Sequence, residues 1–179
     1  IRFDGTNWTT GATLSGTAKP VILFLEWDAK LFILSNAGAL SYTTNEGGLF
    51  IVHAQSNLEA GMFNSLFNYR DTAGTILPYL GTKVGVFILD YEGEKWQETE
   101  LAFPQHDYGC KGVAVWRGAA YISVGMGIYQ YQSSSDPSII TPMGPDRDYG
   151  LPTLLQGNIV KLIPEHNALY AVVCSTDKT

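Results

Sequence analysis

The 179-residue sequence has little charge, only two cysteines and no long apolar run. Charged residues make up 16% of the chain, whereas an ordinary soluble domain has about a quarter. The 11 basic residues form no cluster and the net charge is −6, which excludes a surface that follows nucleic-acid phosphates. Apolar runs such as Val21–Leu25 are short, and no basic stretch with an apolar segment opens the chain. We therefore expect no nucleic-acid partner, no membrane insertion and no signal peptide.

Motifs for catalysis and metal binding are also missing. The sequence has no CxxC, HExxH, P-loop or GxSxG pattern, and His53, His106 and His166 share no metal-ligand spacing. We expect no catalytic residues, no bound metal and no cofactor, and hence not an enzyme. Cys110 and Cys174 allow one disulfide at most, and two buried free thiols are favoured over it.

Short β-rich runs, in contrast, occur along the whole chain and are separated by turn residues such as Asn36–Gly38 and Arg117-Gly118. Met62–Tyr69 comes nearest to a helical pattern, and it is short. Many closely spaced strands are typical of a sandwich, a barrel or a propeller. The predicted strands are Val21–Leu25, Leu31–Leu34, Leu49–Val52, Val84–Leu89, Gly112–Trp116, Tyr121–Val124, Ile128–Tyr131, Ile159–Ile163 and Leu169–Val173.

Internal repetition favours the propeller. Segments of similar sequence recur at offsets of 88, 49 and 41 residues. The matching pairs are Phe3–Trp8 with Tyr91–Trp96, Ala120–Val124 with Leu169–Val173, and Pro104–Gly109 with Pro145–Gly150. One aromatic residue marks the expected third strand of each repeat, at Phe3, Tyr42, Tyr91 and Tyr131. A period of roughly 40–50 residues with several strands per unit is typical of propeller blades.

The phase of the repeat predicts how the blades are assembled. The chain starts in a third strand and finishes after a second strand, so the two ends together supply one blade. The predicted fold is an all-β propeller with four blade equivalents of four antiparallel strands, one of them split between the termini. The predicted blades are residues 1–16 with 157–179, 17–56, 57–104 and 105–156. The ring is either closed with four blades, or half of a larger, eight-blade ring that a second copy completes as a homodimer.

Four segments near the C-terminal half resemble a known repeat: Gly127–Tyr131, Asp148–Pro152, Asn158–Val160 and Ala168–Val172. They are similar to the two-component-regulator propeller repeat, and similar blades occur in uncharacterised phage and environmental proteins. The resemblance covers residues 110–179 and is faint over 20–100. Val172-Val173-Cys174 stands where the repeat has a glycine-threonine ending. The resemblance implies a sensory or binding module that is extracellular, periplasmic or virion-associated, and it transfers no functional residue.

Loops that join strands at one face of a propeller form the expected ligand-binding rim. The motif Asp-Tyr-Gly occurs in two of these loops, and its carboxylates and tyrosines could hold a sugar or a cation. The alternative is structural: Asp caps the turn, Gly adopts positive φ and Tyr packs between blades. A salt-bridged loop is favoured over calcium binding at residues 146–148. The candidate rim residues are His106, Asp107, Tyr108, Asp146, Arg147, Asp148 and Tyr149.

We therefore predict a non-catalytic recognition or scaffold module that senses a ligand outside the cytoplasm or binds at a phage or cell surface. A carbohydrate or a protein is the expected ligand, besides a second copy of the chain. The alternative is a carbohydrate-active enzyme, since the separation of two carboxylates cannot be read from the sequence. Four glutamates around one hairpin are interpreted as a solvated edge that discourages strand aggregation: Glu92, Glu94, Glu98 and Glu100.

Overall fold

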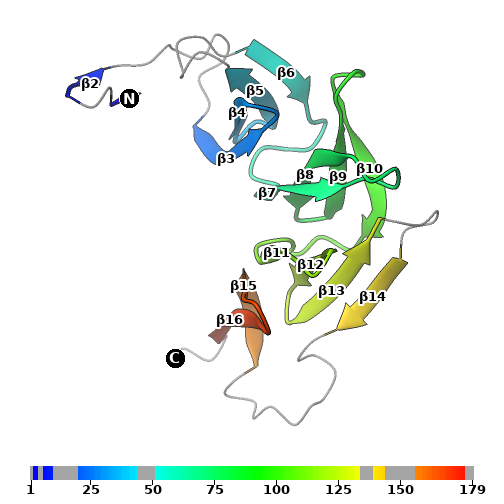
Figure 1. Cartoon of the computed structure of the whole chain (residues 1–179). Coiled ribbons are helices and arrows are strands. Elements are labelled where there is room, and N and C mark those ends of the chain that lie inside the picture. The colour runs from blue at the N-terminus through cyan, green and yellow to red at the C-terminus, as the bar shows by residue number, and fades with distance from the viewer. Residues whose placement is uncertain are drawn as a thin grey trace. The chain divides into compact units, whose positions relative to one another are not determined.

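The computed structural model describes residues 2–3, 6–9, 20–43, 51–133, 139–143 and 156–175, which form strands and the turns between them (Figure 1). These residues include no helix, so none of them forms a helix that is long and apolar enough to cross a membrane. Most of Met62–Tyr69, the segment that comes nearest to a helical pattern, belongs to a strand that the sequence analysis did not predict. Here β7 (Phe63–Arg70) pairs antiparallel with β8 (Ile76–Thr82).

Three sets of four antiparallel strands and two hairpins make up the described fold. The sets are β3–β6, β7–β10 and β11–β14, and a parallel pair of Gln55 with Lys95 links the first two into one hydrogen-bonded sheet. The hairpins are β1–β2 and β15–β16. The other strands are β1 (Arg2–Phe3), β2 (Trp8–Thr9), β3 (Val21–Trp27), β4 (Lys30–Ser35), β5 (Ala39–Thr43), β6 (Ile51–Gln55), β9 (Gly85–Asp90), β10 (Lys95–Ala102), β11 (Val113–Trp116), β12 (Ala119–Val124), β13 (Gly127–Gln132), β14 (Ile139–Met143), β15 (Gly157–Pro164) and β16 (Leu169–Ser175).

The chain divides into two compact units. Unit 1 consists of residues 1–61 and 89–96, and unit 2 consists of residues 62–88 and 97–179. In unit 1, the continuous apolar run of β4 is buried, as Phe32, Ile33 and Leu34 show. A strand that is covered on both faces needs such a run instead of strict alternation. The turn between β3 and β4 has two residues, Asp28 and Ala29, which both have positive φ (50° and 53°).

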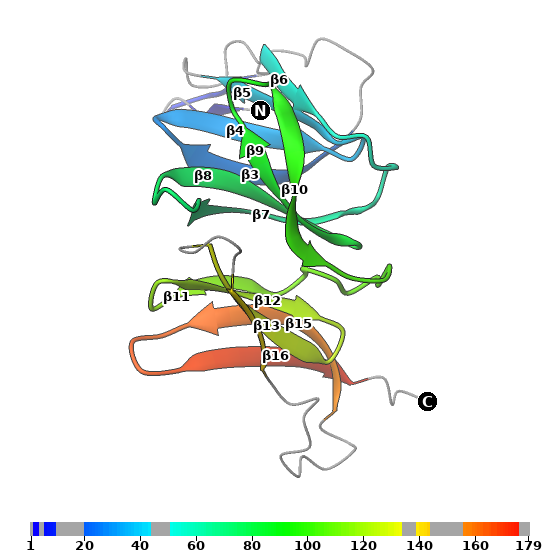
Figure 2. The ribbon, with the colours of Figure 1, turned by 90° about the vertical axis from the view of Figure 1, so that its right-hand side faces the viewer.

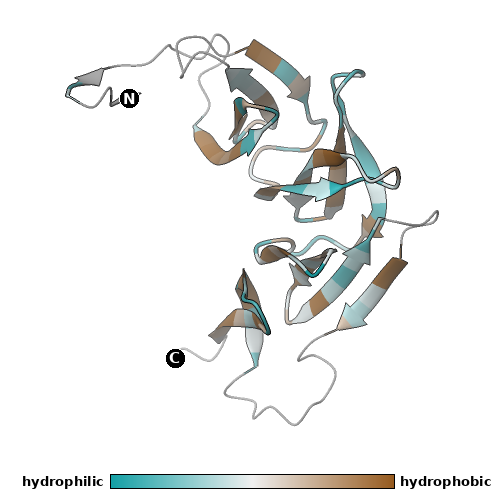
Figure 3. Cartoon of the chain, in the orientation of Figure 1, coloured by the Kyte–Doolittle hydropathy of each residue, from teal (hydrophilic) through white to brown (hydrophobic). Residues whose placement is uncertain are grey.

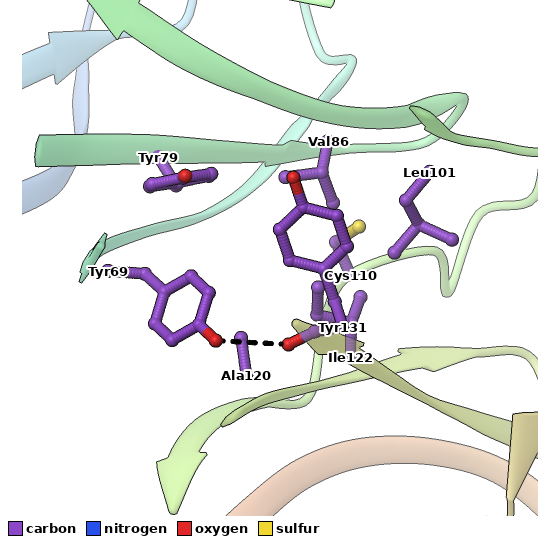
Figure 4. Packing of buried hydrophobic residues seen from close by; sticks show 8 residues of the cluster. All are labelled: Tyr69, Tyr79, Val86, Leu101, Cys110, Ala120, Ile122 and Tyr131. Atoms are coloured by element: carbon purple, nitrogen blue, oxygen red, sulfur yellow. Dashed lines mark hydrogen bonds between the residues drawn. The ribbon is translucent and has the colours of Figure 1, made fainter. Parts of the chain in front are cut away.

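In unit 2, strand β12 lies between two apolar clusters. Ala120 and Ile122 belong to one cluster, together with Tyr69, Tyr79 and Tyr131 (Figure 4). Successive residues of a strand point to opposite faces, so its remaining apolar side chains enter a second cluster. That cluster includes Ala119, Tyr121, Ile159 and Leu162, and it packs the β15–β16 hairpin beside β11 and β12 (Figure 2).

Tyr69 joins two neighbouring strand sets of unit 2. Its hydroxyl donates to the carbonyl oxygens of Gly118 at 3.0 Å and Tyr131 at 3.2 Å. Gly118 lies in the β11–β12 turn and Tyr131 lies in β13, whereas Tyr69 belongs to β7. The buried aromatic residues therefore supply both apolar contact and hydrogen bonds between adjacent sheets.

Two expectations need correction. Tyr91 lies in the turn after β9 and not in the third strand itself, whereas Tyr42 and Tyr131 lie in third strands β5 and β13. The cysteines are both free, but only Cys110 is buried, because Cys174 is exposed on β16. The blade boundaries predicted from the sequence stay a prediction.

Candidate functional site

Three of the predicted rim residues lie in the loop that joins β10 to β11. Here the carboxylate of Asp107 accepts from the Lys83 ammonium at 2.9 Å, and this contact lowers the pKa of Asp107. The Lys111 ammonium lies 4.5 Å from the ring centre of Tyr108. The other four residues, Asp146 to Tyr149, lie outside the described residues. The joint rim therefore stays a prediction.

Hydrogen bonds with the rest of unit 2 hold this loop in place. The Asn64 side-chain amide donates to the carbonyl oxygens of Asp107 at 3.2 Å and Gly109 at 2.7 Å. The His106 backbone amide donates to the Lys83 carbonyl at 2.8 Å, and the Tyr108 amide donates to His106 Nδ1 at 3.1 Å. These contacts give His106 and Asn64 structural roles within the loop.

Gly109 of the Asp-Tyr-Gly motif does not adopt the positive φ that the structural interpretation expected. The positive φ falls on the next residue, Cys110, at 55°. Glycine is instead favoured at position 109 by a close approach, since a Cβ would lie 2.7 Å from Phe103 Cε2. The motif therefore packs against the loop's own aromatic residue.

A cavity of about 430 Å³ on unit 2 was not predicted. It lies where β8, β9 and β10 of one strand set face β13 of the next. Its lining includes three carboxylates, five hydroxyls and one amide, and no lysine or arginine. The lining residues are Asp71, Thr72, Tyr79, Ile88, Gln97, Glu98, Thr99, Glu100, Tyr131 and Ser133.

Buried tyrosine and serine hydroxyls form one side of the cavity. The hydroxyls of Tyr79 and Ser133 both donate to the carbonyl oxygen of Arg70, with an oxygen–oxygen distance of 2.8 Å for Tyr79. Burial raises the pKa of Tyr79, and the charge of nearby Asp71 adds to this effect. Tyr79 therefore stays protonated at neutral pH, and its oxygen retains acceptor capacity.

The opposite side is polar and more exposed. β10 is hydrophilic over most of its length (Figure 3), and Glu98 and Glu100 are exposed at its centre. One oxygen of Asp71 accepts from the Thr75 amide at 2.7 Å, which fixes the carboxylate at the cavity. Carboxylates without basic neighbours in the lining favour cations and hydrogen-bond donors and disfavour anions.

Sequence reasoning missed this cavity because its members are far apart in the chain. Glu98 and Glu100 were interpreted as part of a solvated edge, which their exposure agrees with, but Asp71 and Tyr131 approach them only in the folded unit.

Among the residues that the structure describes, no group of three or more His, Cys, Asp or Glu side chains could hold a metal ion.

Comparison with solved structures shows the fold. The chain is similar to the computationally designed Ika4 protein, with a TM-score of 0.62 and 12% identity over 97% of this chain and 96% of that protein. It is also similar to YCF48 from Cyanidioschyzon merolae, with a TM-score of 0.57 and 11% identity over 94% of this chain. The aligned part is 58% of the YCF48 chain. Both neighbours are propeller proteins, so the all-β propeller prediction is confirmed.

No protein-family model matches the sequence, and no curated protein matches it either. The specific resemblance to two-component-regulator repeats therefore rests on the sequence segments alone. At 11–12% identity, the structural likeness shows the fold and not the function.

Proposed function

We propose that this β-propeller is a non-catalytic recognition or scaffold module that binds a small polar ligand in the cavity of unit 2. The acceptor-rich lining is the observation that carries the proposal. Three carboxylates, from Asp71, Glu98 and Glu100, share the cavity with buried tyrosine and serine hydroxyls. Such a lining suits a ligand that donates several hydrogen bonds.

A carbohydrate is the ligand class that we favour. Its hydroxyls both donate and accept, which matches carboxylate, hydroxyl and amide partners, while Ile88 and the tyrosine rings can contact its C–H surface. The volume of about 430 Å³ is within the usual range of roughly 300–1,000 Å³ for small-molecule sites.

Glycan-array screening followed by calorimetric titration tests this function. We expect Glu98→Gln and Glu100→Gln to weaken binding of the selected glycan about tenfold each, since each removes a charge-assisted hydrogen bond. Glu165→Gln is the matched control, because Glu165 is an exposed glutamate of unit 2 outside the cavity lining. Equal affinity of all three variants and the wild type would place the ligand elsewhere.

The second candidate is a carbohydrate-active enzyme, and the sharing of one cavity by Asp71, Glu98 and Glu100 favours it. Glycoside hydrolysis uses a pair of carboxyl groups, one as acid and the other as base or nucleophile. An enzyme would release sugar from the bound glycan, and Glu98→Gln or Glu100→Gln would abolish release while keeping binding. We expect no release, as a recognition module requires.

We also propose that the chain assembles with a second copy through the edge of β16. Within the described residues, β15–β16 is a two-stranded sheet, whereas three other sets have four strands. Tyr170 and Val172 expose 58% and 43% of their surface on β16, and an exposed apolar edge strand pairs readily with another strand. The partner that we propose for this edge is the β1–β2 hairpin of the second copy. Its segment Phe3–Trp8 matches Tyr91–Trp96, which connects the third strand β9 to the fourth strand β10, so β1 and β2 would add a third and a fourth strand to β15–β16.

Light scattering tests this assembly. We expect a mass of about two chains for the wild type and of one chain for Val172→Lys, because a charge on the edge blocks strand addition. Lys161→Glu on the exposed part of β15 is the control and should leave the mass unchanged. A wild-type mass of 19.6 kDa would overturn the proposal.

The proposed location is outside the cytoplasm or on a virion, and the sequence resemblance over residues 110–179 supports it. Fractionation of cells that express the complete gene tests this part. Recovery only in the cytoplasmic fraction would contradict it.

A further inference from the structure

Five aromatic side chains of unit 1 form a closed circle, which we call the aromatic cup. Adjacent ring centres are 4.3–5.7 Å apart all the way round. The rings come from β3, β4, β5, β6 and the turn after β9. In order round the circle they are Trp27, Phe32, Tyr42, His53 and Tyr91.

The ammonium of Lys30 lies over the aromatic cup. Its Nζ atom is 5.3 Å from the ring centre of Tyr91, 5.7 Å from that of Tyr42 and 5.9 Å from that of Trp27. The carboxylate of Asp28 accepts from the same nitrogen at 2.6 Å. The hydrogen bond with Asp28, helped by one with Tyr91, raises the pKa of Lys30. Three ring faces and one carboxylate therefore create a strong preference for a cation at this point.

His53 adds a hydrogen-bond acceptor to the aromatic cup. Its side chain is buried, with 9% exposed, and its Nε2 atom has no hydrogen-bond partner. Burial lowers the pKa of His53, so the imidazole is neutral at pH 7. A buried polar atom without a partner is costly, and a ligand that donates a hydrogen bond would satisfy it.

We propose that the aromatic cup is a binding site for a methylated alkylammonium cation, which replaces the Lys30 ammonium. Methyl groups gain apolar contact with the rings that a compact, strongly hydrated lysine ammonium cannot gain. Asp28 neutralises the charge, and one remaining N–H of the ligand donates to His53. Lys30 is the resident competitor, and its flexible stem lets the ammonium move into solvent without a change in the backbone.

A second cation–π pair in the chain provides the matched comparison. Lys111 lies over the single ring of Tyr108 in unit 2, with its ammonium 4.5 Å from the ring centre. His106 is the only other ring in contact with Tyr108 among the described residues, at 6.2 Å, and no closed circle of rings forms there. Removal of Lys111 therefore exposes one aromatic face, whereas removal of Lys30 exposes three.

The test is titration of trimethylammonium chloride into the wild type, Lys30→Ala and Lys111→Ala, followed by calorimetry and by NMR of the aromatic side chains. A tethered competitor acts at an effective concentration in the millimolar range, so we expect Lys30→Ala to bind about tenfold more tightly than the wild type. Lys111→Ala should bind like the wild type. Trp27 and Tyr91 resonances should shift in both the wild type and Lys30→Ala.

Tetramethylammonium serves as the probe for the histidine contact, because it has the same charge and no N–H. Weaker binding of tetramethylammonium than of trimethylammonium to Lys30→Ala supports the role of His53, and equal binding overturns it. The whole proposal is overturned if Lys30→Ala binds trimethylammonium no more tightly than Lys111→Ala does. If Lys30→Ala does not fold, the NMR resonances of Trp27 in the wild type decide instead. A shift of these resonances on addition of trimethylammonium supports the site, and no shift overturns it.

Discussion

Replacement of Tyr69 by phenylalanine should measure how strongly one hydroxyl joins adjacent strand sets of unit 2. The phenol is 3% exposed and donates to the carbonyl oxygens of both Gly118 and Tyr131. A net hydrogen bond contributes about 0.5–1.5 kcal/mol, and a buried carbonyl left without its donor adds to the loss. The Gly118 oxygen keeps the Arg70 guanidinium as a second donor at 2.7 Å, which limits that penalty. We therefore expect Tyr69→Phe to lower the free energy of unfolding by about 1–2 kcal/mol.

Tyr69→Ala should cost about 3–5 kcal/mol, since it also removes a buried ring in contact with Tyr79 and Tyr131. Urea denaturation followed by circular dichroism measures both values. Glu165→Gln is the control, because Glu165 is exposed and lies outside both proposed interaction sites, and its effect should stay within about 0.5 kcal/mol. If Tyr69→Phe unfolds at the same urea concentration as the wild type, the hydroxyl contributes nothing and the reasoning fails.

Three further predictions follow from local geometry. Cys174 should react with a thiol reagent at pH 8 while Cys110 does not, because burial raises the pKa of Cys110 to about 12; labelling of both thiols in the native protein would contradict this. Ala29→Gly should raise the free energy of unfolding by about 0.5–1 kcal/mol, since glycine relieves the positive φ at the tip of the β3–β4 hairpin, and a lower urea midpoint would refute it. Lys83→Met should raise the lowered pKa of Asp107 toward its usual value in an NMR titration. In the wild type, the ion pair stabilises the fold at pH values above the pKa that Asp107 has in the unfolded chain, and this contribution is lost as the pH falls through the folded-state pKa. The variant should lack this pH-dependent contribution. An unchanged titration curve for Asp107 would show that Lys83 does not set it.

The repeated pattern of the sequence predicts the propeller because each blade obeys the same local rules. Tyr42 and Tyr131 lie in third strands, as the aromatic spacing predicted. Tyr131 packs against Tyr69 and Tyr79 of the neighbouring strand set, whereas Tyr42 packs against Phe32 and His53 of its own set. Tyr91 lies in a turn, because a repeat in sequence fixes the hairpin but not the residue at which its strand ends.

Some strands escaped prediction because their side chains are mostly polar. β10 (Lys95–Ala102) carries glutamates and other polar residues, since it borders the exposed cavity, and no apolar alternation marks it. β7 (Phe63–Arg70) mixes aromatic and amide residues in a spacing that also suits a short helix. Its pairing with β8 decides the conformation.

The candidate sites were less predictable than the fold, because they depend on contacts between distant segments. The partner of Asp107 is Lys83, in a different loop, and nothing in the Asp-Tyr-Gly motif indicates it. The aromatic cup likewise joins Trp27 to Tyr91, which are 64 positions apart in the sequence. Only the folded sheets bring these residue types together.

The position of β12 between two apolar clusters has a consequence for hydrogen exchange. Ala119 to Ser123 are buried, and their strand is paired on both sides, by β11 and β13. Local fraying cannot expose these amides to water without separating the sheets that cover both faces. Their amide protons should therefore exchange only when unit 2 unfolds as a whole, which makes this strand a reporter of the global opening rate.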